Sequence, residues 1–398
     1  MFCAAGVSSS GSNAASRKDK NELSHDRVIR VCDGWTARHS KHPRCGARVR
    51  VMGPQRRILL IRLSALGDIV FASPLIRAFR QRFPGARISW LVAQPFADVL
   101  AAEHQLDELI VLPVSDWRSL VRARAFRRLA RDVLAFRRSL AGRDFDMAVD
   151  LQGLLKSGIW AWLSGAKWRI GLGSREGSQW LMHQVLDRHG GDPERIASEY
   201  LYLAEELGLP ASPFPMHVAV GGAARQRAAE LLGPLGDGGF AVICPFTTRP
   251  QKHWPDGHWC ELVPRLYDRF GMPVVMLGGP GDRERAGAIS ADRGLVDLVG
   301  RTDIQTAAAI IGRAGYVVGV DTGLTHMGMA FDRPTVCLFG STRPYTNTAT
   351  RQGRVLFHDL PCAPCRRNPT CDGSYDCMRE LVPDEVLSAV AGARESRQ

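Results

Sequence analysis

The sequence predicts an α/β protein with two doubly wound domains. Short apolar runs typical of strands alternate with segments whose apolar residues recur at helical spacing, and this series occurs twice. Three prolines within Leu209–Pro215 interrupt regular structure between the two series and suit a linker. At 398 residues and 45% apolar content, the chain exceeds what one core usually organises. We therefore expect two parallel sheets that bind ligands at the carboxyl ends of their strands, facing across a cleft.

The apolar runs and helical patterns place the elements of each series. In the first, we expect strands at Arg57–Leu63, Arg87–Val92, Glu108–Leu112 and Phe145–Asp150, and helices at Ile69–Phe83 and Trp117–Leu140. In the second, we expect strands at Phe240–Pro245, Pro273–Leu277, Tyr316–Val320 and Thr335–Phe339, and helices at Asp256–Phe270, Ile304–Ile311 and Leu324–Phe331. The predicted domains are residues 52–213 and 214–382, followed by a C-terminal helix and tail at 383–398.

Residues 1–51 do not fit either series. Residues 1–50 carry ten Lys or Arg against four Asp or Glu, which is half of the net charge of +12, and they lack a periodic apolar face. We expect a disordered basic tail, or an extension upstream of a protein whose translation starts at Met52. The segment has no apolar core of an export signal, and no stretch of about 18 apolar residues follows, so a cytoplasmic location is predicted.

Two loops at predicted strand ends carry polar groups that suit a diphosphate. The strand Tyr316–Val320 runs into Asp321, Thr322 and Gly323 and then into a helix, where free amides and the helix dipole favour an anion. His326 lies on the same helix face as Thr322. An ordinary capped helix with a core histidine is the alternative.

The second loop follows the strand Phe240–Pro245. Thr247, Thr248 and Lys252 supply two hydroxyls and a cation, the groups that a departing diphosphate requires, although a surface loop remains the alternative. Further along, the glycine-rich turn before Asp282 suits a carboxylate that binds ribose. Its glycines do not form the dinucleotide fingerprint, which argues against a nicotinamide-dependent oxidoreductase.

Asp68 follows the first strand, in the loop Ser64–Asp68. Its local sequence alone favours a helix cap, because aspartate at a helix start accepts free amides.

Five segments together resemble the bacterial lipopolysaccharide heptosyltransferases, in order and spacing from about Arg57 to Thr342: LSALGD, LQGLLKS, PFTTRPQKHWPDGHW, LGGPGDRER and GVDTGLTHMGMAFDRPTVCLFG. The resemblance implies the GT-B fold, with two Rossmann-like domains. It also implies inverting transfer of L-glycero-D-manno-heptose from an ADP donor to the inner core of lipopolysaccharide, without a required metal or other cofactor.

The resemblance also implies a role for each residue. Asp68 matches the general base that deprotonates the acceptor hydroxyl. Lys252 matches the residue that stabilises the leaving diphosphate, and the other donor-side positions are Thr247, Thr248, Asp282, Asp321, Thr322, Gly323 and His326. On the acceptor side, Arg62, Ser64 and Lys156 lie at strand ends, where the two cations suit a Kdo carboxylate or core phosphates; solubilising surface cations are the alternative.

Two further patterns concern partners. Eight arginines between Arg118 and Arg138 alternate with apolar residues, which suits a helix resting on anionic lipid at the inner face of the inner membrane, or a solvated helix. Near the C-terminus, the spacing of Cys362, Cys365, Cys371 and Cys377 suits a structural zinc site or free thiols.

The acceptor and the class of function have alternatives. The cysteine-rich end resembles the second heptosyltransferase type, whereas TTR-x-x-KHWP resembles the first, so a heptose-terminated core or another nucleotide sugar stays an alternative substrate. A noncatalytic protein that binds nucleic acid or lipid through basic surface is the alternative from another class. We expect an enzyme without a nucleic-acid partner.

Overall fold

The computed structural model describes residues 56–235, 239–289, 293–365 and 368–396. The predictions for residues 1–51 lie outside this part of the chain. None of the helices in these ranges combines the length and the hydrophobicity of a membrane-spanning segment.

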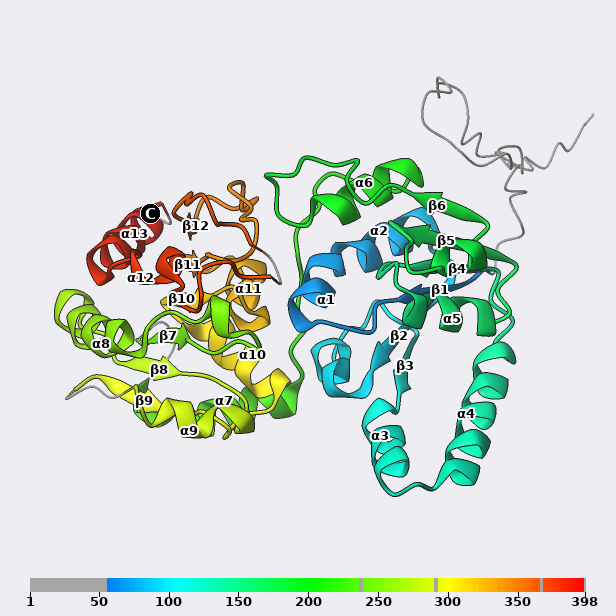
Figure 1. The fold of residues 1–398 in the computed structure, drawn as a ribbon, viewed down its shortest axis with the longest axis horizontal. Coiled ribbons are helices and arrows are strands. Elements are labelled where there is room, and N and C mark those ends of the chain that lie inside the picture. Colours follow the sequence, from blue (N-terminus) through cyan, green and yellow to red (C-terminus); the bar gives the residue numbers. More distant parts are fainter. Residues whose placement is uncertain (1–55, 236–238, 290–292, 366–367, 397–398) are drawn as a thin grey trace, which may run out of the picture. The chain divides into compact units, whose positions relative to one another are not determined.

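Two six-stranded parallel sheets form the centre of the described chain (Figure 1). The first contains β1 Arg57–Ile61, β2 Arg87–Ala93, β3 Glu108–Leu112, β4 Met147–Asp150, β5 Trp168–Leu172 and β6 Gln184–Leu186. The second contains β7 Ala241–Cys244, β8 Val274–Met276, β9 Leu295–Asp297, β10 Tyr316–Val320, β11 Thr335–Leu338 and β12 Gly353–Leu356.

Both sheets have the same strand order. The order is β3-β2-β1-β4-β5-β6 in the first and β9-β8-β7-β10-β11-β12 in the second, so the first and fourth strands of each series are neighbours. The chain runs outward in opposite directions from this pair, and ligands of open α/β sheets bind at such a switch point, beyond the carboxyl ends of the strands. The site should therefore involve the segments after β1, β4, β7 and β10.

Helices connect most of the strands. In the first half these are α1 Leu66–Ala72, α2 Pro74–Arg82, α3 Val114–Arg122, α4 Phe126–Ala141, α5 Leu155–Leu163 and α6 Ser198–Glu206. In the second half they are α7 Gly222–Leu232, α8 Asp256–Phe270, α9 Arg283–Ala286, α10 Ile304–Arg313, α11 Gly323–Ala330, α12 Asp376–Arg379 and α13 Pro383–Glu395. Short 3₁₀ turns are η1 Gln94–Leu100, η2 Ser178–Leu181, η3 Gly233–Leu235, η4 Pro250–Lys252 and η5 Pro280–Asp282.

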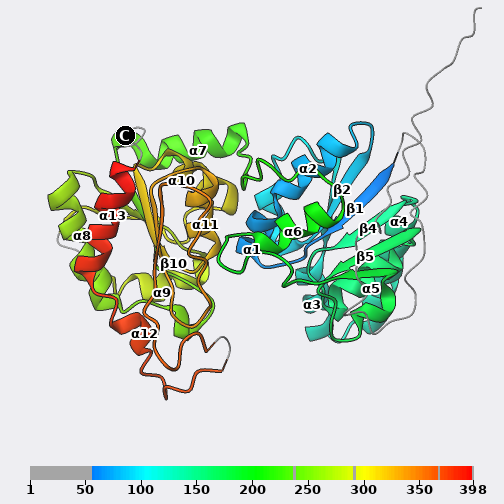
Figure 2. The same ribbon diagram turned by 90° about the horizontal axis from the view of Figure 1, so that it is seen from above.

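Alternating side chains of the central strands enter different cores. In β7, Val242 and Cys244 pack with α10, whereas Ala241 and Ile243 pack with α8 and α13 on the other face. Figure 2 shows helices on both faces of this sheet. Because successive residues of a strand point to opposite faces, a strand covered on both faces is apolar throughout, as AVIC is in β7.

Two helices predicted as continuous are each divided. The predicted helix Ile69–Phe83 is α1 and α2, separated at Ser73 because Pro74 lacks the amide needed to continue α1 and instead begins α2. The predicted helix Trp117–Leu140 is α3 and α4, joined by a turn in which Arg124 has a φ of 53°. The two form a helical hairpin (Figure 1).

Candidate functional site

Most of the predicted polar residues follow the strands of the two switch points. Asp68 follows β1 in α1, and Lys156 follows β4 in α5, in the first sheet. Lys252 follows β7 in η4, and Asp321 follows β10, in the second. The strand order therefore brings together the loops of Lys252 and Asp321, which are about 70 residues apart in the sequence and are joined by a hydrogen bond.

Asp321 is the centre of the donor-side cluster. Lys252 Nζ lies 2.5 Å from Asp321 Oδ2, and the Thr342 hydroxyl donates to the same oxygen at 2.6 Å. The side chains of Lys252 and Asp321 are each only 15% exposed. Burial alone would raise the pKa of Asp321, but His326 and Lys252 outweigh it and hold this pKa well below its usual range. The carboxylate is therefore charged and holds Lys252 in place.

His326 extends the cluster into the core. Its Nε2 lies 3.1 Å from Asp321 Oδ1, and its Nδ1 lies 2.9 Å from the Tyr345 hydroxyl. The Phe71 ring of α1 covers the imidazole, with 4.6 Å between ring centroids. His326 is 3% exposed and orients Asp321 from within the core, and direct contact of its imidazole with the donor stays a prediction.

Two glycines allow α1 of the first sheet to approach α11 of the second. A Cβ on Gly67 would lie 2.8 Å from His326 Cδ2, and a Cβ on Gly323 would lie 2.6 Å from Leu66 Cγ. Both distances are too short for any larger residue without a shift. The helix that carries Asp68 is thus in direct contact with the helix that follows Asp321.

The other predicted donor-side residues follow β7, β8 and β10, at the carboxyl ends of these strands. Thr322 is the N-cap of this helix and has extended backbone angles, which leaves the first amides of α11 directed toward the strand ends. In the described part of the chain, the hydroxyls of Thr247 and Thr248 have no hydrogen-bond partner, so both are free to meet an anion. Asp282 accepts from the Gly279 amide at 2.8 Å within its own turn, and ribose binding by this residue stays a prediction.

Asp68 is the third residue of α1 and not its N-cap. Its Oδ2 accepts from the Ala65 amide at 3.2 Å, which is a capping interaction from inside the helix, and forms an ion pair with Arg62 Nη2. The carboxylate is 40% exposed, so it remains accessible beside these contacts.

The three predicted acceptor-side residues differ in exposure. Arg62 is only 5% exposed, and its Nη1 donates to the Leu151 carbonyl at 2.9 Å. Ser64 accepts from Gln152 Nε2 at 3.3 Å at the strand ends, and Lys156 is exposed on α5. The structure thus leaves Lys156 open to an anionic ligand but encloses Arg62.

Residues that the sequence interpretation missed complete the cluster. Thr342 and Tyr345 follow β11, the neighbour of β10, and Phe71 lies in α1. The signal available for Thr342 was a hydroxyl just beyond a predicted strand, as for Thr247. Tyr345 and Phe71 gave no such signal, because their contacts with His326 depend on how α1 and α11 pack.

The four C-terminal cysteines are free thiols. Among the described residues, no group of three or more His, Cys, Asp or Glu side chains is placed to hold a metal ion. Burial, and then the three other thiols of the group, raise the pKa of Cys377 to about 11. The zinc site therefore stays a prediction without support from the geometry of the described residues.

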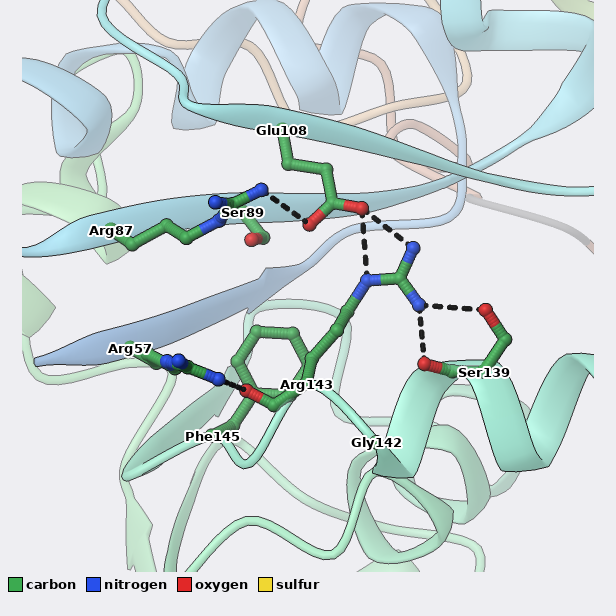
Figure 3. A pocket seen from close by; sticks show the side chains of 8 residues that line it. All are labelled: Arg57, Arg87, Ser89, Glu108, Ser139, Gly142, Arg143 and Phe145. Carbon is green, nitrogen blue, oxygen red and sulfur yellow. Dashed lines mark hydrogen bonds and ion pairs between the residues drawn. The ribbon is translucent and has the colours of Figure 1, made fainter.

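A separate hollow of about 360 Å³ lies at the opposite, amino-terminal edge of the first sheet (Figure 3). Arg57, Arg87 and Glu108 begin β1, β2 and β3 there. Arg143 donates to Glu108 at 2.6 and 2.9 Å, and Arg87 lies 3.6 Å from the same carboxylate. Glu108 therefore compensates part of this positive charge, and the hollow is remote from the strand ends that carry the predicted site.

Two Rossmann-like sheets of the same strand order, each with helices on its faces, are the architecture of the GT-B glycosyltransferases. Comparison with known proteins agrees. The model of glycosyltransferase family 9 (heptosyltransferase) matches residues 133–375. The chain belongs to this family and is a glycosyltransferase, which confirms the predicted family and enzyme class and excludes the noncatalytic alternative.

Curated relatives cover most of the chain. Lipopolysaccharide heptosyltransferase 1 of Pseudomonas aeruginosa is 31% identical over 79% of this chain and 87% of its own length. The corresponding enzyme of Escherichia coli K12 is 27% identical over 72% and 89%. Lipopolysaccharide heptosyltransferase 2 of Escherichia coli K12 is 24% identical over 83% and 96%.

Solved structures confirm the predicted fold. A family 9 glycosyl transferase from Veillonella parvula superposes with a TM-score of 0.72 at 20% identity, over 85% of this chain and 97% of that one. The E. coli heptosyltransferase WaaC with ADP-2-deoxy-2-fluoro heptose superposes with a TM-score of 0.64 at 24% identity, over 84% and 99%.

Proposed function

We propose that this enzyme transfers L-glycero-D-manno-heptose from ADP-heptose to the Kdo residue of the lipopolysaccharide inner core, with inversion at the anomeric carbon. The observation that carries the proposal is the Lys252–Asp321 ion pair beside the start of α11, with the helix of Asp68 in contact with α11. A relative named lipopolysaccharide heptosyltransferase 1 supports a lipopolysaccharide acceptor, and a structure described with an ADP-heptose analogue supports the donor.

Lys252 and the start of α11 act on the leaving group. As the bond from the anomeric carbon to ADP breaks, negative charge develops on the diphosphate. The amides at the start of α11, the free hydroxyls of Thr247 and Thr248, and the Lys252 ammonium stabilise this charge. An ammonium has three N–H donors, so Lys252 can keep Asp321 as partner while it donates to a phosphate oxygen.

Asp68 acts on the acceptor. It takes the proton from the acceptor hydroxyl while that oxygen attacks the anomeric carbon. The hydroxyl oxygen forms the new glycosidic bond, the bonding pair to ADP leaves with the diphosphate, and the proton stays on Asp68. Lys156, exposed near the same strand ends, supplies a cation for the acidic groups of the acceptor.

Turnover with defined substrates tests both roles. Wild type, Asp68→Asn and Lys252→Ala are incubated with ADP-heptose and either a Kdo-terminated or a heptose-terminated core lipid. We expect product from the Kdo-terminated acceptor, and loss of turnover of at least about 100-fold in both variants. Asp68→Asn should keep wild-type affinity for ADP, whereas Lys252→Ala should lose affinity for it.

Each outcome addresses a different part of the proposal. Full activity of Asp68→Asn removes this residue as the base. Product only from the heptose-terminated acceptor identifies the second heptosyltransferase type, and transfer from another nucleotide sugar alone refutes the donor.

We also propose that the enzyme is cytoplasmic and attaches peripherally to the inner face of the inner membrane through the α3–α4 hairpin. All eight arginines of this segment are exposed, and α3 buries no residue. At the turn between the helices, Val121 is 49% exposed and Phe126 is 59% exposed. The neighbouring residues in the sequence include Arg122, Arg124 and Arg127. Exposed apolar residues flanked by arginines suit the interface of an anionic bilayer.

Flotation with liposomes tests this attachment. Arg122, Arg127 and Arg131 are changed together to Glu, and the matched control changes three exposed arginines of the second half, Arg225, Arg301 and Arg351, in the same way. We expect the hairpin variant, but not the control, to lose binding to anionic vesicles. Equal binding of the hairpin variant and wild type rules out this face.

A further inference from the structure

We infer that Arg62 is a positioning residue that holds Asp68 in the orientation needed for catalysis, and that it does not bind the acceptor. This inference rests on the proposed role of Asp68 as the base. It replaces a role predicted from the position of Arg62 at a strand end with one that follows from its contacts.

Arg62 is enclosed by the carboxyl ends of three neighbouring strands. It directly follows β1, its backbone amide donates to Leu91 of β2, and its Nη1 donates to the carbonyl of Leu151, which follows β4. The Trp90 indole donates to the Arg62 carbonyl at 3.3 Å. Hydrogen bonds thus hold both the backbone and the guanidinium of Arg62, and the side chain exposes almost no surface to an incoming ligand.

Asp68 is the carboxylate with which this buried cation forms an ion pair. Arg62 Nη2 and the Ala65 amide both approach Oδ2, one from the strand ends and the other from the start of α1. In the described part of the chain, Oδ1 has no hydrogen-bond partner. Two donors on one oxygen therefore fix the carboxylate and leave the other oxygen for the acceptor hydroxyl.

The charge of Arg62 strengthens this arrangement. Burial lowers the pKa of the guanidinium, but nearby anionic groups, among them the carboxylates of Asp68 and Glu199, more than offset this and raise it above its ordinary value. Arg62 is therefore a permanent buried cation, and a buried cation that loses its partner is strongly destabilising.

The two roles predict different kinetics. If Arg62 binds the acceptor in its ground state, its removal should mainly raise the KM of the acceptor. An arginine that only orients the base leaves both KM values nearly unchanged and lowers kcat, because a misplaced base fails in the transition state.

The test compares Arg62→Met, Arg62→Lys, Asp68→Asn and the double variant Arg62→Met/Asp68→Asn in the full-length enzyme, with ADP-heptose and the acceptor that wild type uses. Arg77→Met, an exposed arginine of α2, is the control. We expect kcat to fall about 100-fold in Arg62→Met and about tenfold in Arg62→Lys, with both KM values and ADP affinity within about threefold of wild type. The double variant should be no slower than Asp68→Asn, because Arg62 acts only through Asp68.

Thermal unfolding of the same variants gives a second, independent measurement. Asp68→Asn leaves the buried guanidinium without its partner, so this variant should unfold at a lower temperature than the double variant, in which both charges are absent. Since the double variant carries no unpaired charge, it keeps the test valid even where Asp68→Asn folds poorly.

Several outcomes would overturn the inference. These are wild-type kcat in Arg62→Met, an increase confined to the KM of the acceptor, or a double variant much slower than Asp68→Asn. If Asp68→Asn itself is fully active, the proposed base is wrong. A normal Arg62→Met beside an inactive Asp68→Asn instead refutes only the positioning role.

Discussion

Asp321 connects more of the predicted site than any other residue described above. Its Oδ2 meets Lys252 and Thr342, and its Oδ1 meets His326. These contacts keep the carboxylate charged although it is largely buried. Because charged partners outweigh burial, the pKa of Asp321 is depressed in the folded protein.

This depressed pKa predicts a pH-dependent contribution to stability. The contribution is fully present above the pKa of about 4 that an unfolded aspartate has, and it is lost as the pH falls toward the lower folded pKa. Asp321→Asn should lower the free energy of unfolding by about 2–3 kcal/mol at pH 7, and by less at pH 3.5. Urea unfolding at pH 7, 5 and 3.5 measures this. A difference between wild type and variant that stays constant with pH would contradict the assignment.

At the scale of elements, three aromatic rings attach the α3–α4 hairpin to the first domain. Trp117 of α3, Phe136 of α4 and Trp160 of α5 lie with centroids 5.2–5.8 Å apart. α4 buries only Leu140 fully, so much of its attachment depends on this group.

Phe136→Ala should therefore loosen the hairpin. We expect a loss of about 2–3 kcal/mol in the free energy of unfolding, because the ring packs against two tryptophans. Leu134→Ala, in the same helix but 47% exposed, is the matched control and should change stability by less than about 0.5 kcal/mol. Urea unfolding compares the two. Equal effects would show that the aromatic group does not hold the hairpin.

For the whole molecule, the repeated strand order brings each pair of site loops together at a switch point.

The second sheet also buries two thiols, Cys244 in β7 and Cys337 in β11. Burial raises the pKa of Cys244 to about 12 and also raises that of Cys337. Both thiols are protonated and enclosed while this sheet is intact.

These thiols should report unfolding of the second sheet. At pH 8 we expect N-ethylmaleimide to modify the half-buried Cys260 of α8 in the folded protein, and to modify Cys244 and Cys337 only when the sheet unfolds. Peptide mass spectrometry across a urea series follows each position separately. Rapid modification of Cys244 in the absence of urea would show that the sheet opens under native conditions.

Many elements were predictable because their signals are local. β3, α8 and β10 have the predicted bounds, since an apolar run or a helical pattern ends at a clear breaker in each case. Short edge strands such as β6, β9 and β12 were not predicted, because three or four residues carry too little periodicity. Lys252, Asp321 and Asp68 were predicted as site residues from their positions after apolar strands and from the resemblance to the heptosyltransferase family.

The local order of residues was sufficient to predict the α/β alternation and the family. The contacts of Arg62 with Asp68, of Lys252 with Asp321, and of His326 with Phe71 and Tyr345 required the folded chain. A strand or helix pattern depends on neighbours within a few residues. Whether a polar side chain is exposed to a ligand or enclosed by another strand depends on pairings between segments far apart in the sequence. For this reason we infer a different role for Arg62 from its contacts than from its sequence position, whereas the role proposed for Asp321 is unchanged.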